Sequence, residues 1–311
     1  MIEQLSNLYA PSGREEEVRN RIIEELADFY KDVKIDNLGN LVIHKPGKKK
    51  KIAITAPMDE VSFLVTHTKT PDLVVATSVG DVNQSALQNI AVKDADDRLL
   101  ILDSTDNKAD KIGKIRDLNF KIISECKVDE LDTIFLSKTL IFDNKLQNSG
   151  GNFVGKALER SVCCSVLCNL ARILTDSLYE YYFIFTSYNY CDKKGAHTVT
   201  YNVEIDELYN LCCVDADNNT VKSGAGPVVI LRDKLYVSPN DVNDKFGKFD
   251  NKQTLVTNSL VCEAGIFQKQ FTTEAVYALG VPVNYLYSPN EVVNQEDIEA
   301  TYEMLKEALL P

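Results

Sequence analysis

Residues Ala53–His67 read AITAPMDEVSFLVTH: an apolar run, an acidic pair and a second apolar run. The run Lys51–Ala56 predicts a strand, and SFLVT predicts another strand after the pair Asp59 and Glu60. In an open α/β sheet, ligands bind beyond the carboxyl ends of the strands. The acidic pair therefore stands where such a sheet would hold its functional site.

Helix and strand patterns alternate on both sides of this stretch. A capping box of Ser12 and Glu15 predicts an amphipathic helix over Gly13–Tyr30, and Ala157–Leu174 is apolar nearly all round, which predicts a buried helix. Continuous apolar strands follow, and a final helix is expected to start near Asn294. We therefore expect an α/β fold with a mixed sheet flanked by helices.

The middle of the chain has a different pattern. Between about His67 and Gly155 it consists of short β-rich pieces separated by turn residues, with little helical periodicity. Such a segment predicts a small β-barrel inserted into the main domain. The expected domains are 1–66 together with 155–311, which form the α/β domain, and 67–154, which forms the insertion.

Composition excludes several classes of function. The formal net charge is −12, whereas a nucleic-acid surface needs clustered Lys and Arg, so no nucleic-acid partner is expected. The one basic run, Lys48–Lys51, is interpreted as a solvated hairpin tip. No apolar run reaches the roughly 18 residues of a membrane span, and the first residues do not resemble a signal peptide. We expect a cytoplasmic protein with no membrane partner.

The cysteines form no C-x-x-C motif, which argues against a zinc finger or a redox pair. Several stand inside apolar runs, where a free thiol behaves as a small hydrophobic side chain. We therefore expect reduced cysteines. They are Cys126, Cys163, Cys164, Cys168, Cys191, Cys212, Cys213 and Cys262.

Acidic residues collect at the expected strand ends. Besides Asp59 and Glu60 there are Glu159 at the start of the buried helix, Asp215 after one strand and Glu263 after another. Carboxylates that converge at one sheet edge repel one another unless a cation or a proton lies between them. The pattern indicates the remains of a metal site.

Several segments, in order along the whole chain, resemble the motifs of one family of dinuclear metallopeptidases. Ala53–His67 is similar to the family's A-x-H-M-D-E-I-G-F-M-V-T-H, and Val154–Leu167 is similar to V-G-K-A-L-D-D-R-V-G-C. The chain thus resembles the family of glutamyl aminopeptidase, tetrahedral aminopeptidase and endoglucanase M proteins. The remaining matching segments are Thr77–Val92, Ile184–Thr198, Cys212–Ala216 and Val281–Val293.

The resemblance implies two zinc or cobalt ions held by two His, a bridging Asp, a Glu and a further Asp, with a separate Glu as general base. Asp215 keeps its ligand type, and Asp59 keeps the carboxyl that orients the first His in the family. The other positions are changed. Pro57 stands for the first His, Glu159 for the bridging Asp, Asn189 for the general base, Tyr190 for the metal-binding Glu and Tyr287 for the last His.

These replacements predict an inactive homologue without a metal cofactor. Proline has no side-chain donor, asparagine cannot take a proton from water, and a catalytic zinc site usually has three protein ligands. Tyr190 and Tyr287 are expected to fill the vacated cavity, with their hydroxyls bonded to the leftover carboxylates. The surviving role would be that of a structural or regulatory subunit, or of a peptide-binding protein.

Other interpretations stay open from the sequence. One metal ion held by Glu159, Asp215 and nearby cysteines would leave a metallo-aminopeptidase. A nucleophilic enzyme would need His44, His67 or His197 beside a serine or cysteine, and a glycosidase would use paired carboxylates. The family also implies a homo-oligomer, either a dimer or a dodecamer, with the insertion as dimerisation domain. A mixed oligomer with an active relative is the further possibility.

Overall fold

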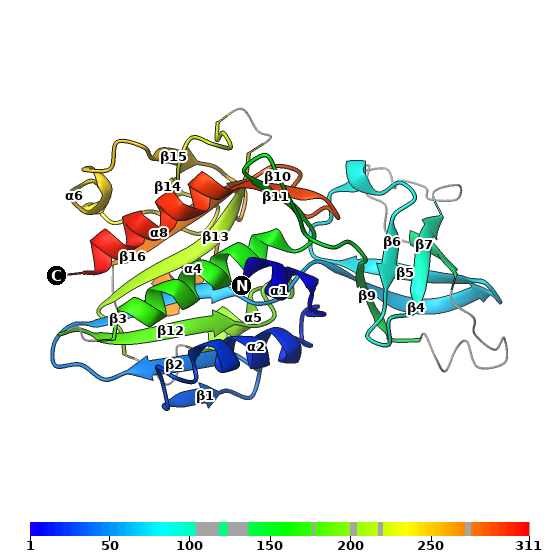
Figure 1. The fold of residues 1–311 in the computed structure, drawn as a ribbon, viewed down its shortest axis with the longest axis horizontal. Coiled ribbons are helices and arrows are strands. Elements are labelled where there is room, and N and C mark those ends of the chain that lie inside the picture. The colour runs from blue at the N-terminus through cyan, green and yellow to red at the C-terminus, as the bar shows by residue number, and fades with distance from the viewer. Residues whose placement is uncertain are drawn as a thin grey trace.

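The computed structural model describes residues 1–103, 118–123, 136–175, 178–199, 204–216, 220–270 and 275–310. It consists of a layered α/β part and a closed barrel that projects from one side of it (Figure 1). This architecture confirms the expected α/β fold with a mixed sheet, flanking helices and an inserted barrel. Cys126 lies outside the described residues, and the other seven cysteines are free thiols.

An eight-stranded mixed sheet forms the centre of the α/β part. The four central strands, β12, β3, β13 and β16, are parallel, so their carboxyl ends meet at one edge. That edge is where ligand sites form in such sheets. The strand order is β1 (Val33–Ile35), β2 (Leu41–Lys45), β12 (Glu180–Thr186), β3 (Lys51–Pro57), β13 (Glu207–Asp215), β16 (Val276–Val283), β14 (Val228–Arg232) and β15 (Gln253–Val256).

Helices cover both faces of the sheet. One face carries the larger apolar core, with α4 (Leu158–Ile173) buried along nearly its whole length. The burial of apolar surface on the two faces is the main favourable term that holds these layers together. The same face is covered by α1 (Ile2–Asn7), α2 (Glu16–Leu26), α6 (Val242–Phe246) and α8 (Gln295–Leu309), and the other face by α5 (Lys194–Val199) and α7 (Ala264–Gln270).

The two ends of the chain differ in how well their helices follow the expected capping. α8 starts as expected, because the Asn294 side chain accepts a hydrogen bond from the Glu296 backbone N at 2.8 Å. The expected capping box of Ser12 and Glu15 is wrong, since α2 begins at Glu16 without a side-chain cap. Ser12 instead donates to Asp59. The residues of the expected cap therefore tie the N-terminal loop to the carboxyl edge of the sheet.

The barrel closes on itself through six strands, and Phe63, Phe120 and Phe142 pack inside it with ring centroids 5.1 and 5.4 Å from that of Phe63. The boundary expected after residue 66 falls inside its first strand. The other expected boundary falls inside β11 (Asn152–Gly155), which pairs with β10 (Gln147–Ser149) and β17 (Glu291–Asn294). The barrel order is β4 (Ser62–Thr70), β5 (Leu73–Val79), β8 (Leu118–Ile122), β7 (Leu99–Asp103), β6 (Ala91–Lys93) and β9 (Thr139–Phe142).

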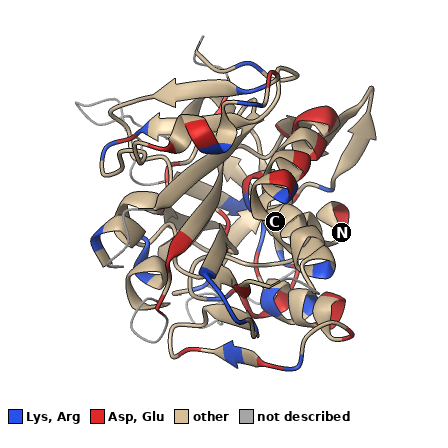
Figure 2. Cartoon of the chain, turned by 90° about the vertical axis from the view of Figure 1, so that its left-hand side faces the viewer, with Lys and Arg blue, Asp and Glu red and all other residues tan. Residues whose placement is uncertain are grey.

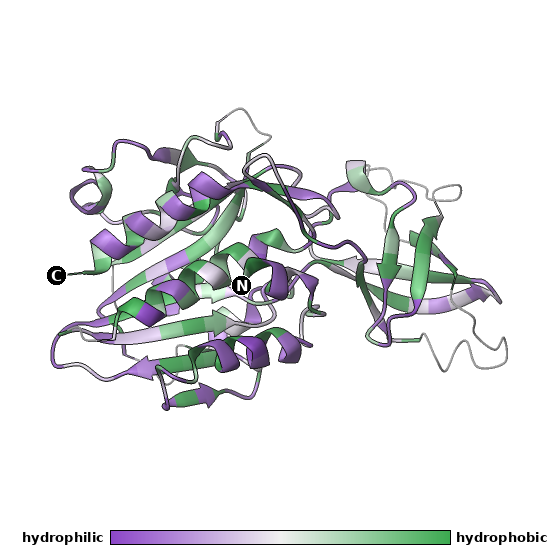
Figure 3. Ribbon diagram, in the orientation of Figure 1, coloured by the Kyte–Doolittle hydropathy of each residue, from purple (hydrophilic) through white to green (hydrophobic). Residues whose placement is uncertain are grey.

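Hydropathy follows these layers. Hydrophobic residues gather on the strands of the sheet and the barrel, whereas α2 and α8 turn hydrophilic residues outward (Figure 3). None of the helices in the described ranges combines the length and the apolar character that crossing a bilayer requires.

Candidate functional site

The carboxyl edge of the sheet gathers the residues expected at the site. Asp59 follows β3, Asp215 ends β13, and Glu159 lies in the first turn of α4. The loops after β12 and β16 complete this edge. Of the expected positions within the described part of the chain, Asp59 and Asp215 do not line the small cavity found here. Those that line it are Pro57, Glu159, Asn189, Tyr190 and Tyr287.

The cavity itself is almost filled. Its volume is about 20 Å³, and it is also lined by Cys212, Cys213 and Glu263. A water molecule needs roughly 10–15 Å³ of such space, whereas small-molecule sites measure roughly 300–1,000 Å³. The cavity therefore has room for about one water molecule.

Two tyrosine rings line this cavity. The rings of Tyr190 and Tyr287 meet edge to face, with centroids 5.7 Å apart and an interplanar angle of 89°. The Tyr190 hydroxyl donates to Glu159 Oε1 at 3.2 Å. Both rings keep part of their surface exposed, yet burial raises the pKa of both hydroxyls well above the ordinary value. Tyr190 thus makes the expected contact with a leftover carboxyl group.

The loops that carry these rings have strained backbones. Tyr188 and Lys193 on one loop have φ of 53° and 51°, and Tyr285 and Tyr287 on the other have 56° and 63°. Non-glycine residues rarely adopt this left-handed region, and each costs about 1–3 kcal/mol when the surroundings hold it there. Such strain is typical of loops that position ligands or catalytic groups.

Glu291 fixes the start of α4 and was not expected from the sequence. Its carboxylate accepts hydrogen bonds from the backbone N of Leu158 (2.7 Å), Glu159 (3.1 Å) and Tyr287 (2.7 Å). These donors favour the charged form of Glu291. Burial raises the pKa of both Glu291 and the neighbouring Glu159, and the two carboxyls coexist in this buried place by sharing a proton. The sequence feature that could have indicated this role is Glu291 itself, which ends the segment SPNE at residues 288–291.

Asp59 is fully buried and faces the N-terminal loop. Its Oδ2 accepts from Ser12 and from the Tyr190 backbone N at 3.1 Å, while its Oδ1 has no hydrogen-bond partner. Burial raises the pKa of Asp59. Burial, together with the nearby Asp59, also raises the pKa of Glu15 to about 7. The carboxyl that orients a metal ligand in the family here anchors backbone instead.

Glu263 lies on the other side of the cavity with a lysine nearby. Its Oε2 accepts from Thr186 Oγ1 at 2.8 Å, and its Oε1 is buried without a partner. Burial raises its pKa to about 7, and the positive charge of Lys193 opposes that rise. Lys193 Nζ also donates to Asn189 Oδ1 at 2.8 Å. A lysine thus supplies positive charge near these acids, which the sequence motifs did not indicate.

The cysteines near the cavity act as core side chains. Cys213 Sγ donates to the Glu159 carbonyl oxygen at 3.2 Å and lies 3.8 Å from Cys163 Sγ. Cys164 Sγ donates to the Pro57 carbonyl oxygen at 3.2 Å. Burial raises the pKa of Cys213 and Cys164 well above the ordinary value. Metal ligation requires the thiolate, so this burial disfavours the cysteines as ligands.

A buried ionic cluster holds the N-terminal segment to α4 just behind the site. Lys156 Nζ lies 2.8 Å and Arg160 lies 3.1 Å from the carboxylate of Glu60. Both cations also donate to the Leu8 carbonyl oxygen. The side chains of all three ions are at most 2% exposed, so the cluster depends on each member being paired.

The three histidines lie on three separate elements, β2, β4 and α5. His44 in β2 has Asp32 at 2.9 Å and Glu180 at 3.0 Å on its two ring nitrogens. His67 belongs to the barrel strand β4, and His197 of α5 is 3.2 Å from the Gln270 side-chain nitrogen. These contacts give no support to a nucleophilic triad.

The donor set does not fit the two metal ions of the family. Pro57 offers no side-chain atom, Glu159 Oε1 already accepts from a tyrosine, and Asn189 Oδ1 accepts from a lysine. Within the described ranges, no three His, Cys, Asp and Glu side chains are grouped so that they could hold a metal ion. A two-ion clamp needs both ions and their ligands in place.

The parallel-centred sheet, the inserted barrel and the acidic carboxyl edge together define a metallopeptidase-like α/β protein. The family model of the M42 glutamyl aminopeptidases matches residues 39–304. The chain therefore belongs to the M42 glutamyl aminopeptidase family.

Solved structures of aminopeptidases share the fold over nearly the full length. Aminopeptidase APDkam598 from the archaeon Desulfurococcus kamchatkensis is 22% identical, with a TM-score of 0.87 over 98% of this chain and 92% of that chain. The dodecamer PhTET1-12s is also 22% identical, with a TM-score of 0.86 over 100% and 99%. The TET1 peptidase of Pyrococcus horikoshii, which can assemble into a tetrahedron or a large octahedral shell, is 22% identical with a TM-score of 0.84 over 99% and 98%.

Proposed function

We propose that this chain is a non-catalytic member of the M42 family whose metal centre is replaced by the protein's own side chains. The observation that carries the proposal is the filled cavity. The rings of Tyr190 and Tyr287 meet beside Glu159 and leave about 20 Å³. An aminoacyl group does not fit in that space while the rings stay in place.

The hydrogen bonds around the cavity support the same proposal. A hydrolase needs a group that takes a proton from water, but the Asn189 amide is not basic and accepts from Lys193. Three carboxyls near the cavity, those of Asp59, Glu159 and Glu263, are buried, and burial raises the pKa of each, which favours the protonated forms over metal-binding carboxylates.

Metal binding and turnover test the proposal in the same samples. Purified protein would be offered zinc and cobalt at near-stoichiometric levels, bound metal measured by elemental analysis, and aminoacyl substrates assayed. No retained ion and no turnover are expected for the wild type and for Glu159→Gln alike. An ion that the wild type retains and Glu159→Gln loses, together with hydrolysis, would refute the proposal. It would favour a single-ion site of Glu159, Asp215 and nearby cysteines instead.

The proposed surviving role is that of a structural subunit in a homo-oligomer. Similar structures form a dodecamer and tetrahedral or octahedral shells. We assign the barrel as the dimerisation domain, because β7 alternates Leu100 and Leu102 inward with the partly exposed Leu99 and Ile101 outward. The free thiols of the described cysteines suit the reducing cytosol.

Sedimentation of the purified chain tests this role. An assembly of more than one chain is expected at micromolar concentration. A monomer would refute homo-oligomerisation. Recovery of an active relative with the purified chain would favour a mixed oligomer, and thermal stabilisation by added peptides without turnover would favour peptide binding.

A further inference from the structure

An open cavity lies on the face of the sheet that α5 and α7 cover. It measures about 400 Å³, within the roughly 300–1,000 Å³ typical of small-molecule sites, and is called the β2 cavity below. It is lined by residues 34–36, Val42, His44, Tyr182 and Val199. Tyr182 precedes Thr186, the last residue of β12, by four positions, which is about 13 Å along the strand. The β2 cavity is therefore separate from the filled cavity at the carboxyl edge.

Two stacked rings form part of the β2 cavity wall. His44 and Tyr182 are paired neighbours on β2 and β12, and their ring centroids lie 4.6 Å apart with an interplanar angle of 20°. Carboxylates hold both rings in place. His44 Nδ1 lies 2.9 Å from Asp32 Oδ2, and Nε2 lies 3.0 Å from Glu180 Oε1. The Tyr182 hydroxyl donates to the same Glu180 oxygen at 2.6 Å. Rings fixed in this way offer a prepared surface to a third aromatic ring.

Charges of both signs line the β2 cavity beside the rings. Lys34 and Asp36 both line it, one on each side of Ile35. Asp36 is held in position, because its Oδ1 accepts from the backbone N of Leu38 at 2.9 Å and of Asn40 at 3.0 Å. β1 and the chain on either side of it carry basic and acidic residues alike (Figure 2). A ligand in this cavity therefore meets one cation and one anion.

The His44 ring adds no unbalanced positive charge to this pair. Carboxylates only accept hydrogen bonds, so the ring meets both of its partners only with a hydrogen on each nitrogen. That form is a cation between two anions, Asp32 and Glu180. His44 therefore contributes aromatic surface, and recognition of charged groups falls to Lys34 and Asp36.

Aliphatic side chains complete the β2 cavity. Val42 and Val199 are buried, whereas Ile35 is 51% exposed and lies at the opening. Apolar atoms of a ligand that cover these side chains leave water, which contributes about 25 cal/mol per Å² of apolar surface buried. The lining thus combines an aromatic wall, an apolar wall, a cation and an anion.

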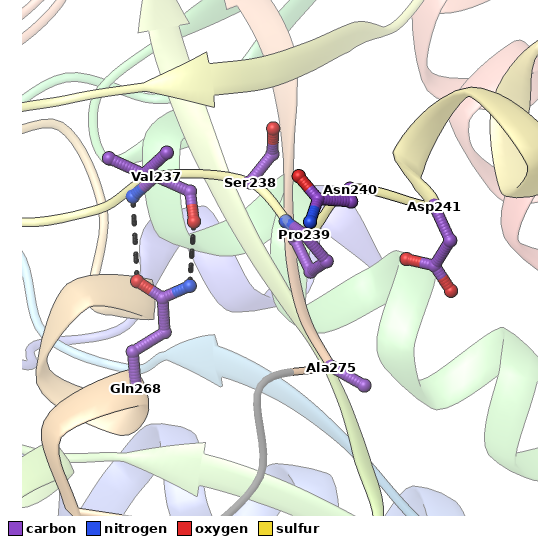
Figure 4. Close-up of a pocket in the computed structure, with 7 residues that line it drawn as sticks. All are labelled: Val237, Ser238, Pro239, Asn240, Asp241, Gln268 and Ala275. Atoms are coloured by element: carbon purple, nitrogen blue, oxygen red, sulfur yellow. Dashed lines mark hydrogen bonds between the residues drawn. The ribbon is translucent and has the colours of Figure 1, made fainter.

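The larger cavity at residues 237–241 lacks this combination. It measures about 490 Å³ and is also lined by Gln268 and Ala275. Gln268 fixes its rim, because the side chain bonds both the backbone N (3.4 Å) and the carbonyl oxygen (2.7 Å) of Val237 (Figure 4). Among the described residues that line it, none is aromatic or basic. Volume alone is therefore present there, without groups that would recognise a ring or a carboxylate.

We propose that the β2 cavity binds a free aromatic amino acid. The ring of the ligand packs against the stack of His44 and Tyr182, its carboxylate pairs with the Lys34 ammonium, and its ammonium group pairs with the Asp36 carboxylate. A zwitterion satisfies both charges of the lining, whereas an ion of one sign would meet a like charge. This inference does not depend on the proposed loss of the metal centre.

Binding can be measured with L-tryptophan, because the chain itself contains no Trp. The indole of the probe is excited apart from the protein's tyrosines, and its fluorescence anisotropy rises when it binds the purified chain. Two analogues separate the two charges of the probe. Tryptamine lacks the carboxylate, and indole-3-propionate lacks the ammonium group.

Matched variants locate the site. Tyr182→Leu removes one ring of the stack, whereas Tyr182→Phe keeps the ring and removes only its hydroxyl. Lys34→Gln removes the cation of the lining, and Lys31→Gln is its control at an exposed lysine that does not line the β2 cavity. Ser238→Phe places a bulky ring in the larger cavity at residues 237–241. Circular dichroism checks that each variant is folded.

L-tryptophan is expected to bind the wild type and the variants Tyr182→Phe, Lys31→Gln and Ser238→Phe with similar affinity. Tyr182→Leu should weaken binding about tenfold, because the ring stack is lost. Lys34→Gln should weaken it about threefold, because an exposed ion pair is lost. Each analogue should bind the wild type more weakly than L-tryptophan does, since one charge of the lining stays unmatched.

Three outcomes would overturn this inference: no binding to the wild type at millimolar L-tryptophan, binding that Tyr182→Leu leaves unchanged, or binding that Ser238→Phe removes. Equal affinity for tryptamine or indole-3-propionate would show that only one charge is recognised, and would also refute an amino acid as the ligand. None of these results concerns metal binding or turnover, so each would leave the proposed function standing.

Discussion

Glu263→Gln tests whether the buried acids at the carboxyl edge of the sheet destabilise the folded chain when they ionise. Burial raises the pKa of Glu263 from 4.5 to about 7. In the unfolded chain the same carboxyl loses its proton near pH 4.5, so between these values the folded state binds more protons than the unfolded state. The free energy of unfolding therefore falls as the pH rises through this window.

The size of the effect follows from the shift. A difference of about 2.5 pH units corresponds to roughly 3 kcal/mol, at 1.36 kcal/mol per unit. The penalty is absent below pH 4.5, where both states are protonated, and complete above about pH 7. Glutamine has nearly the shape of the Glu263 side chain and cannot ionise, so the free energy of unfolding of the variant should not fall as the pH rises.

Urea unfolding at several pH values between 4 and 8 measures the difference between variant and wild type. We expect the stability of Glu263→Gln relative to the wild type to rise by about 3 kcal/mol across this range. The exposed Glu299→Gln serves as control and should show little change with pH. A difference between Glu263→Gln and the wild type that stays constant with pH would show that Glu263 keeps its ordinary pKa. The reasoning from burial would then be wrong.

Substitutions at three further positions probe packing, ion pairing and capping, each measured by urea unfolding at pH 7. Tyr190→Phe should lower the free energy of unfolding by about 1–2 kcal/mol, because the Glu159 carboxyl loses the hydrogen bond from the Tyr190 hydroxyl. Tyr190→Ala should lower it further, because loss of the ring enlarges the cavity. Equal losses for the two variants would show that packing of the Tyr190 ring adds no stability. Glu60→Gln should cost roughly 3–5 kcal/mol because two buried cations lose their anion, so a loss below ~1 kcal/mol would contradict the cluster's role. Asn294→Ala should cost about 1 kcal/mol by removing the bond to the Glu296 backbone N, and an unchanged stability would mean that the cap contributes nothing.

The sequence predicted the fold well because hydrophobic periodicity directly reports burial. The run before Asp59 became β3, and the all-round apolar Ala157–Leu174 became α4. The predicted helix start near Asn294 was also right, because an Asn side chain at the N-cap position accepts a hydrogen bond from a backbone N–H of the first turn. The change to short β-rich pieces separated by turn residues between about His67 and Gly155 also predicted the inserted barrel.

The sequence was less informative where a residue has competing partners. Ser12 and Glu15 fit a capping box, yet Ser12 donates to the buried Asp59, whose second oxygen already lacks a partner. A local pattern cannot show that a distant buried carboxyl will compete for the same hydroxyl. Lys193 and Glu291 were missed for a similar reason, since their roles depend on loops with left-handed residues.

The edge-to-face contact of Tyr190 and Tyr287 bears on how easily a metal site could arise at this edge of the sheet. Each ring supports the other, and they come from loops far apart in the sequence. Replacing one of them by a metal-binding residue would remove packing before any ion had enough ligands to bind. No single substitution therefore leads toward a metal site without first losing stability.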